Sequence, residues 1–236
     1  MKYSNQTRML VAVDCIIFGF DGTDYKILLI QRGFAPEKEK WSLMGGFVQM
    51  DETLDEAAKR ILNQLTGLHD VYMDQMSAFS QPSRDPIERV IAVPYVSLID
   101  IEKYSKQINN DFHAKWFSIR EIPKLIFDHG DMVELALQQL RYKAALHPIL
   151  FELLPEKFTL PQLQTMYEGL YDIKLDKRNF TRKLLSSNLL HKENDKDKSS
   201  SKKGAYYYSL NEDFYTRNLS NILPIVSKSD ISLAAE

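Results

Sequence analysis

Residues 46–67, GFVQMDETLDEAAKRILNQLTG, contain the pattern that decides the fold. Gly46 is followed six positions later by Glu52 and then by Arg60, and the stretch ends on Thr-Gly. The apolar residues between them recur at helical spacing: Leu54, Ala57, Ala58, Ile61 and Leu65. We therefore expect a loop that leads into an amphipathic helix over 53–65. The turn after Arg60 reads Ile-Leu-Asn-Gln-Leu and contains no acidic residue, which sets the question of what this loop and helix are for.

Composition places the chain among ordinary soluble globular proteins. Its 236 residues suffice for one large domain or two modest ones, and 44% are hydrophobic and 26% charged. The net charge of −2 by itself indicates neither a nucleic-acid coat nor a membrane partner. The single Cys15 excludes an internal disulfide and is expected to be a buried core residue. Since no apolar run approaches about 18 residues and no signal peptide is evident, we expect a cytoplasmic protein without a membrane partner.

Strands and helices are mixed over the first 145 residues. Strands are expected over 9–20, 25–32 and 89–99, and another within 114–125, with a strong amphipathic helix over 131–144. Pro94 should push the third strand towards a sheet edge or a bulge. This alternation predicts an α/β or α+β domain.

Residues 30–68 resemble the Nudix hydrolase signature, with matching residues at Gly46, Glu52, Arg60, Leu62, Gly67 and Leu68. The resemblance implies an α/β/α sandwich with a mixed sheet. In that family three glutamates on one helix face hold Mg²⁺ or Mn²⁺ against a diphosphate. This chain has Ile61, Gln64 and Leu65 at those positions. We therefore expect no metal, no cofactor, no catalytic residue and no enzymatic activity, and a hydrolase frame kept for its pocket.

The loops around this pattern supply a candidate effector site. Residues 79–95, FSQPSRDPIERVIAVPY, resemble the segment that related ADP-ribose-binding members place beside their ligand. Arginine suits phosphate or neighbouring hydroxyls, and aspartate suits hydroxyls; the alternative is an Arg–Asp pair that only stiffens a loop. Trp41 and Phe47 could stack on a sugar or base or simply pack inside. The expected effector-binding residues are Arg32, Trp41, Gly45, Gly46, Glu52, Arg84 and Asp85.

The character of the sequence changes after His147. Thr159 and Gln162 have the spacing of a helix N-terminal capping box, and Asp176 is an expected cap for a second, basic helix. The segments LLHKE and AYYYSL, on either side of a Lys- and Ser-rich tip, are expected to pair as a hairpin. This order is typical of a winged helix-turn-helix. We predict a Nudix-like domain over 1–148, a winged helix domain over 149–218 and a tail over 219–236.

Positive charge is concentrated in this second part. Residues 174–203 contain ten Lys or Arg and four acidic residues, an excess of six positive charges that leaves −8 for the rest of the chain. A solvated helix and a Lys-rich loop would give the same count, but beside a helix-turn-helix outline the charge favours a DNA backbone. DKRNFTRKLL also resembles the recognition helix of the Nudix-related transcriptional regulators. The expected DNA-binding residues are Lys177, Arg178, Asn179, Thr181, Arg182, Lys183, Lys192, Lys202 and Lys203.

The sequence therefore predicts a ligand-responsive transcriptional regulator that binds double-stranded operator DNA as a homodimer. The family resemblance implies a sugar or sugar-nucleotide effector. Because the metal carboxylates are missing, the expectation is a neutral sugar, L-arabinose, in control of sugar utilisation. The alternatives are an ADP-ribose-responsive regulator of NAD metabolism, a diverged hydrolase acting on ADP-ribose-like diphosphates, and a protein–protein scaffold.

Overall fold

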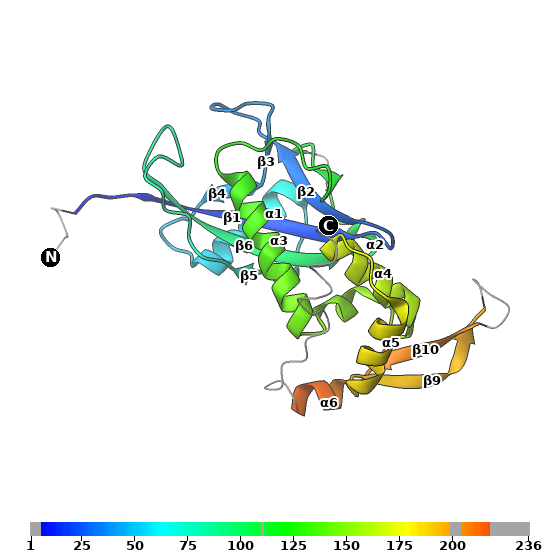
Figure 1. Ribbon diagram of the computed structural model, residues 1–236. Helices are drawn as coiled ribbons and strands as arrows, with labels where there is room; N and C mark the ends of the chain where they lie inside the picture. Colours follow the sequence, from blue (N-terminus) through cyan, green and yellow to red (C-terminus); the bar gives the residue numbers. More distant parts are fainter. Residues whose placement is uncertain (1–5, 110, 199–203, 218–236) are drawn as a thin grey trace. The chain divides into compact units, whose positions relative to one another are not determined.

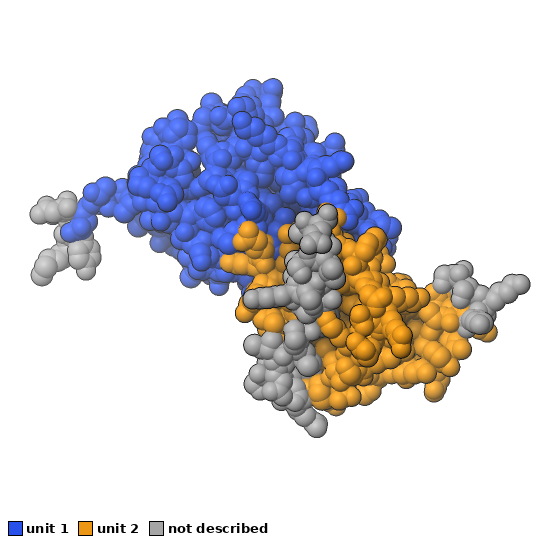
Figure 2. Space-filling view, in the orientation of Figure 1, with its two compact units in different colours: residues 1–137 blue, residues 138–236 orange. Residues whose placement is uncertain are grey.

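The computed structural model describes residues 6–109, 111–198 and 204–217, in two compact units, 1–137 and 138–236 (Figure 2). The compact units meet inside helix α3 (His129–Leu146), while the domain boundary at residue 148 stays a prediction. The physical reason is local hydrogen bonding: Arg141 Nε donates to the Leu170 carbonyl at 2.9 Å, and the Tyr167 hydroxyl donates to the Ala144 carbonyl at 3.1 Å. Among the described residues, no helix has the length and apolar character needed to cross a membrane.

The first unit is built on a mixed sheet, as the sequence predicted. Strand β1 (Leu10–Phe20) pairs antiparallel with β2 (Tyr25–Gln31) and parallel with β6 (Val90–Asp100), in register from Leu10↔Val90 to Phe20↔Asp100. The sheet order is β3-β2-β1-β6-β5, with β3 at Trp41–Ser42 and β5 at Asp74–Gln75. Strand β4 (Met44–Phe47) pairs with β1, and β7 (Lys115–Ser118) pairs with β2.

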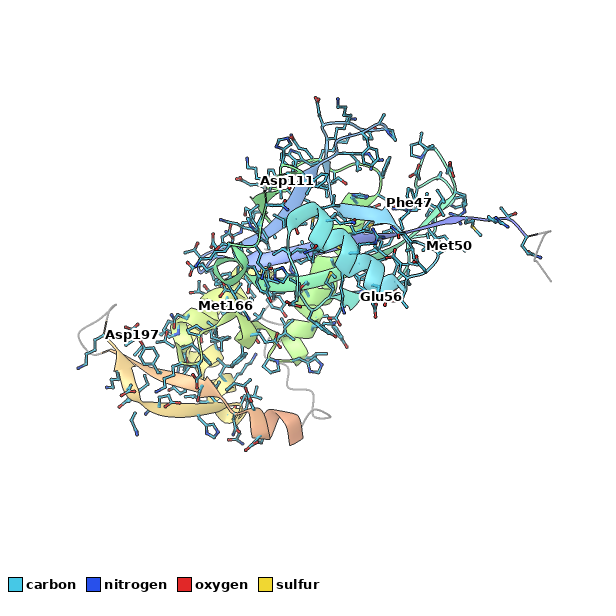
Figure 3. The ribbon with its side chains drawn as sticks, turned by 180° about the vertical axis from the view of Figure 1, so that it is seen from behind. Phe47, Met50, Glu56, Asp111, Met166 and Asp197 are labelled. Atoms are coloured by element: carbon cyan, nitrogen blue, oxygen red, sulfur yellow. The ribbon has the colours of Figure 1, made fainter. Side chains whose placement is uncertain are left out.

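Helices cover both faces of this sheet, which confirms the α/β/α sandwich. Figures 1 and 3 view the molecule from opposite sides, with α3 in front of the sheet in one and α1 (Leu54–Thr66) in front in the other. One core cluster joins Val13, Cys15 and Ile17 of β1 to Ala57, Ala58, Ile61 and Leu62 of α1. The short helix α2 (Ile101–Tyr104) follows β6.

Helix α1 is shifted by one residue from the predicted 53–65, and both of its ends are capped. Thr53 is the N-cap and forms a capping box with Glu56, which satisfies backbone N–H groups that have no partner inside the helix. Gly67 ends the helix at φ 80°. A Cβ at Gly67 would lie 2.3 Å from the Gln107 carbonyl oxygen, so both the backbone conformation and the space require glycine.

Pro94 lies in the middle of β6 rather than at an edge or a bulge. Its carbonyl accepts a hydrogen bond from Met76 N–H at 2.8 Å, on the side of the two-residue strand β5. A residue's N–H and C=O point to the same neighbour in a strand, so the missing N–H faces this irregular outer segment. The ladder with β1 is therefore intact across Pro94.

The second unit has the predicted helix-turn-helix and hairpin. Helix α4 (Leu160–Tyr171) starts at the Thr159 capping box, and α5 (Lys177–Ser186) starts at Asp176, whose side chain accepts from Asn179 N–H at 2.8 Å. Strands β9 (Leu190–Asp197) and β10 (Ala205–Leu210) form the hairpin. The sequence did not predict β8 (Phe158–Thr159), the 3₁₀ helix η1 (Ile149–Leu153) or α6 (Glu212–Arg217). The sheet order is β8-β10-β9.

The turn between α4 and α5 is held by one carboxylate. Glu168 accepts hydrogen bonds from Leu175 N–H and from Gln164 Nε2, both at 2.9 Å, and Asp172 takes the left-handed conformation at φ 55°. Phe180 of α5 packs edge-on against Tyr167 of α4, with ring centroids 5.6 Å apart. These contacts fix the angle at which α5 leaves α4.

The Nudix position occupied by Ile61 predicts a stability effect. Ile61 is 3% exposed, and a Cβ on Gly46 would lie 2.7 Å from its Cδ1, so no space is left for another group. Restoring the family's residue by Ile61→Glu should lower the free energy of unfolding by roughly 2–5 kcal/mol, because it buries a carboxyl group and removes apolar contacts. Urea unfolding of the full chain measures this.

Gln64→Glu is the matched control, because this substitution also restores a family glutamate but does so at an exposed position. It should change the free energy of unfolding by less than about 0.5 kcal/mol. An Ile61→Glu protein that unfolds at the wild-type urea midpoint would contradict the packing described above.

Candidate effector pocket and nucleic-acid interface

A cavity of about 200 Å³ lies at the junction of β1, β2, β4 and the loop before α3. It brings together five of the predicted effector residues: Arg32, Gly45, Gly46, Arg84 and Asp85. It also contains two polar residues that the sequence did not single out, Asp14 and His129. Aromatic rings form part of its wall, at Phe34, Phe47, Phe112 and Phe127; Phe47, which ends β4, is labelled in Figure 3. Such a lining can bind a ligand with both polar and flat apolar parts.

Asp14 lies at the floor of this cavity. Side chains alternate along β1, so Val13 and Cys15 join the core under α1 while Asp14 faces the opposite side. Asp14 is 4% exposed. Gly45 is its partner in the β1–β4 register, and a Cβ on Gly45 would lie 2.3 Å from Asp14 Oδ1. Gly45 is exposed, so its missing side chain keeps this carboxylate oxygen accessible from the cavity.

His129, the first residue of α3, stands beside that carboxylate. Its Nδ1 accepts a hydrogen bond from Leu43 N–H at 3.2 Å, which assigns the ring proton to Nε2. Nε2 lies 3.6 Å from Asp14 Oδ1. Burial lowers the pKa of His129, with Asp14 acting in the opposite direction, so the ring is neutral near pH 7. The cavity floor therefore offers an acceptor and an N–H donor side by side.

Arg32 follows β2 and supplies a positive charge to the wall. Its guanidinium carbon lies 4.1 Å from the centroid of the Phe34 ring and 5.6 Å from that of Phe127. Its Nε is buried and has no hydrogen-bond partner among the described residues. Burial lowers the pKa of Arg32, and Asp85, Asp14 and Glu37 counteract this. Arg32 therefore brings a positive charge to the cavity wall, while its Nε is covered by surrounding atoms.

Arg84 has a structural partner. Its Nε and Nη2 donate to the two carboxylate oxygens of Asp128 at 2.9 and 2.7 Å, in the bidentate geometry typical of strong Arg–carboxylate pairs. The Arg84 side chain is only 5% exposed. The adjacent Asp85 accepts from Ile87 N–H at 2.8 Å and so shapes its own loop. The sequence left open whether Arg84 and Asp85 pair with each other; each instead uses another partner, and both still line the cavity.

Two predicted effector residues lie outside the cavity lining. Trp41 packs edge-on against Phe117, with centroids 4.7 Å apart, so the packing alternative holds for its ring. Glu52 is held by Arg60, whose Nε and Nη2 donate to it at 2.8 and 2.5 Å. Arg60 also donates to the Phe47 carbonyl, which ties the loop to the helix. Glu52 and Arg60 thus clamp the loop to the helix.

The residues at the family's metal positions do not fit a divalent cation. Ile61 packs against Gly46, and Gln64 Oε1 accepts from Arg60 Nη1 at 3.2 Å. Leu65 is a wall residue of the cavity. Hard cations need charged or carbonyl oxygens, and two of these side chains have none. Within residues 6–109, 111–198 and 204–217, no group of three or more His, Cys, Asp or Glu side chains is placed to hold a metal ion.

The second unit presents the predicted basic helix. Lys177, Arg178, Asn179 and Arg182 are all exposed on α5, while Phe180 and Leu184 anchor its inner face. Thr181 and Lys183 are half-buried. Arg182 Nη2 donates to Asn179 Oδ1 at 3.0 Å, so these two side chains present a joint polar surface. The arrangement suits contacts to phosphates and base edges.

The hairpin contains both basic and acidic side chains. Lys192 and Lys196 place their Nζ atoms 3.7 and 4.2 Å from the centroid of the Tyr206 ring, which orders both ammonium groups. Glu193 and Asp195 lie close to Lys157. The predicted contacts Lys202 and Lys203 lie outside the described residues, as does the tail over 219–236.

A signal for Asp14 was present in the sequence. It is a carboxylate inside the apolar run VAVDCIIF, and an acidic residue in a buried strand is rarely there without a role. For His129 and Asp128 no comparable local signal exists, because their partners are 115 and 44 positions away in the chain.

The Glu52–Arg60 pair predicts a pH-dependent stability. Arg60 lowers the pKa of Glu52 from 4.5 to about 2. A depressed carboxyl pKa stabilises the fold above pH 4.5, and this contribution is lost as pH falls through 2. The difference in free energy of unfolding between wild type and Glu52→Gln should therefore be greatest at neutral pH and shrink between pH 4.5 and 2.

Urea titrations across this pH range measure the difference. Glu88→Gln, at an exposed glutamate outside the pair, is the control, and its free energy of unfolding should vary with pH in parallel with that of the wild type. A wild-type minus Glu52→Gln difference that does not vary with pH would contradict the ion pair.

Comparison with known proteins agrees with both units. The NUDIX domain family matches residues 8–136, and the NrtR DNA-binding winged helix domain matches residues 150–210. The chain is 34% identical over 224 residues to the ADPR responsive transcriptional repressor NtrR of Acinetobacter baylyi, covering 93% of this chain and 89% of that protein.

Solved structures give the same result. Shewanella oneidensis NrtR complexed with a 27mer DNA is 29% identical, with a TM-score of 0.72 over 87% of this chain and 95% of that one. The NUDIX domain of the same protein complexed with ADP ribose is 28% identical, with a TM-score of 0.52 over 59% of this chain and 94% of that one. A degenerate Nudix box, a polar cavity beside it and a basic winged helix thus occur together in a chain that belongs to the NrtR family of Nudix-related transcriptional regulators.

Proposed function

We propose that this protein is an ADP-ribose-responsive transcriptional repressor that does not hydrolyse its effector. The observation on which this rests is the 34% identity to an ADPR responsive repressor across 93% of the chain. That match spans both the cavity and the basic helix, so it supports the joint action of effector and DNA rather than either one alone. The effector changes DNA affinity because binding at one site is linked to binding at the other.

The side chains that line the cavity support ADP-ribose as the effector. Arg32 lines the cavity with a positive charge suited to a diphosphate oxygen. Exposed phenylalanine rings at positions 34 and 47 offer flat faces for an adenine. The comparisons favour this effector over the neutral sugar that the missing glutamates suggested, since the matched repressor responds to ADP-ribose.

A small neutral sugar, with L-arabinose as the case to test, is the second candidate. The volume of the cavity favours it: about 200 Å³ is below the roughly 300–1,000 Å³ of pockets for larger ligands. Arg84 is also committed to Asp128, which leaves fewer cations for a diphosphate. Control of sugar use would then replace control of NAD metabolism.

DNA binding is assigned to α5 and the hairpin. Two half-sites of a near-palindromic operator need two recognition helices, so a homodimer belongs to the proposal. On α5, DNA phosphates and bases are contacted by the exposed side chains of Lys177, Arg178, Asn179 and Arg182. On the hairpin, Lys192 contacts the phosphate backbone of the DNA.

A gel shift tests the DNA part. The full chain should bind a fragment from upstream of its own operon, and the double variant Arg178→Ala/Arg182→Ala should bind at least about tenfold more weakly, because each change removes a contact worth ~1–3 kcal/mol. Lys106→Ala/Lys124→Ala removes the same charge from exposed positions of the first unit and should bind as wild type. Equal binding by both double variants would contradict the assignment to α5.

Adding ADP-ribose or L-arabinose to the bound fragment tests the effector. ADP-ribose should weaken DNA binding, and L-arabinose should not. The reverse result would establish the second candidate in place of the first.

Absence of hydrolysis is a separate prediction. Incubation of ADP-ribose with the protein and Mg²⁺ or Mn²⁺ should release no AMP, because Ile61, Gln64 and Leu65 cannot replace three carboxylates. Chromatographic detection of AMP measures this, with an active Nudix ADP-ribose pyrophosphatase as positive control. Turnover at ordinary enzyme rates that disappears in Glu52→Gln would contradict it.

A further inference from the structure

We propose that Asp14, with His129 beside it, recognises two neighbouring hydroxyl groups of a five-carbon sugar ring at the floor of the cavity. The inference rests on the proposed function only in taking this cavity as the effector site. The ring hydroxyls are the part of the ligand that is bound, and Asp14 is the residue that binds them. The five-carbon ring is shared by the riboses of ADP-ribose and by a free pentose, so the same chemistry serves both candidate effectors.

The first support is that Asp14 is buried without a hydrogen-bond donor. No hydrogen bond to its carboxylate is found among the described residues, and His129 Nε2 at 3.6 Å is beyond ordinary hydrogen-bonding length. A buried charge in this state is costly unless something completes it. Both Asp14 and His129 line the cavity, so a ligand is the group in position to do so.

The second support is the space kept open for the carboxylate. Gly45 faces Asp14 in the β1–β4 register, and any side chain there would begin 2.3 Å from Oδ1. Gly45 has no positive φ, so its backbone conformation alone does not demand glycine. It is the lack of space over Asp14 Oδ1 that requires glycine at this position.

The arrangement of donors and acceptors selects hydroxyls over other groups. Asp14 can only accept, while His129 Nε2 donates and the Arg32 side chain adds a positive charge to the cavity wall. A hydroxyl donates and accepts at the same atom, and Oδ1 and Nε2, 3.6 Å apart, can both reach one hydroxyl oxygen. An amino group only donates and would leave the His129 N–H without an acceptor. A pair of neighbouring hydroxyls uses both oxygens of the carboxylate and the adjacent donor.

Calorimetric titration of the full chain tests this with ADP-ribose, D-ribose and L-arabinose, with their deoxy forms 2-deoxy-D-ribose and 2-deoxy-L-ribose, and with ADP-ribose analogues that lack one hydroxyl of either ribose. Whichever ligand binds, we expect Asp14→Asn to lower its affinity at least about tenfold, as for the loss of a hydrogen bond to a charged group. The deoxy form of that ligand should bind the wild-type protein as weakly as the parent ligand binds Asp14→Asn. Asp14→Asn should then no longer distinguish the parent ligand from its deoxy form.

Two further variants separate recognition from folding. Gly45→Ala should also weaken binding, because its methyl group covers Oδ1. Asp70→Asn, an exposed carboxylate outside this cavity at φ 55°, should bind as wild type. Without ligand, Asp14→Asn should melt close to wild type, since no hydrogen bond to the carboxylate is lost among the described residues and the cost of burying its charge offsets its attraction to Arg32.

The outcomes separate this inference from the proposed effector. Binding of a pentose but not of ADP-ribose, lost in Asp14→Asn, would support the inference and overturn ADP-ribose as effector. Binding of ADP-ribose with equal strength by wild type and Asp14→Asn would overturn the inference and leave the effector standing. Independent, additive effects of the variant and the missing hydroxyl would overturn it too, as would wild-type protein that binds none of these ligands.

Discussion

The alternation of side chains along β1 is the constraint on which the first unit depends. Parallel pairing with β6 over eleven residues and antiparallel pairing with β2 and β4 leave this strand no freedom to shift. A slip by one residue would turn Val13, Cys15 and Ile17 away from the α1 cluster and move Asp14 into it. The burial of the apolar set therefore also fixes where the carboxylate points. Asp14 reaches the cavity because its neighbours must reach the core.

Side-chain contacts also explain how the Nudix loop and helix are held together in this chain. Arg60 bridges Glu52, Gln64 and the Phe47 carbonyl, so the loop remains fastened to α1 without a metal ion. Ile61 uses the position of a metal ligand to pack against Gly46, and Leu65 turns another into cavity wall. The helix positions that are charged in the family carry two apolar side chains and one amide here, while Asp14, Arg32 and His129 supply polar groups to the cavity from other elements.

In the second unit, α4 supports α5, and α5 exposes its basic side chains. Glu168 holds the turn by accepting from Leu175 N–H, and Phe180 packs against Tyr167, so the outer face of α5 is left for Arg178 and Arg182. The hairpin beside it orders Lys192 and Lys196 on Tyr206. Its acidic residues, near Lys157, reduce the net charge of the hairpin, so α5 supplies the more purely basic surface.

Local patterns in the sequence were sufficient for the longer helices and strands and for their order. The predicted capping residues Thr159 and Asp176 and the helical spacing of apolar residues act over one or two turns, and each is where the structure has it. The Nudix outline, the loss of its carboxylates and the basic helix are equally readable from spacing alone. Short strands such as β3, β5 and β8 were missed because two residues contain too little pattern to be recognised.

Pairing between distant residues was decided only by the tertiary structure. Arg84 is bound by Asp128, His129 stands beside Asp14, and Glu52 faces Arg60. Trp41 packs inward on Phe117, and the division between the units falls inside α3 because Arg141 and Ala144 bond to α4. The sequence determined a Nudix-like frame without its metal ligands, joined to a basic winged helix. Only the fold decided which polar groups meet at the cavity floor, because those meetings depend on the register of strands far apart in the chain.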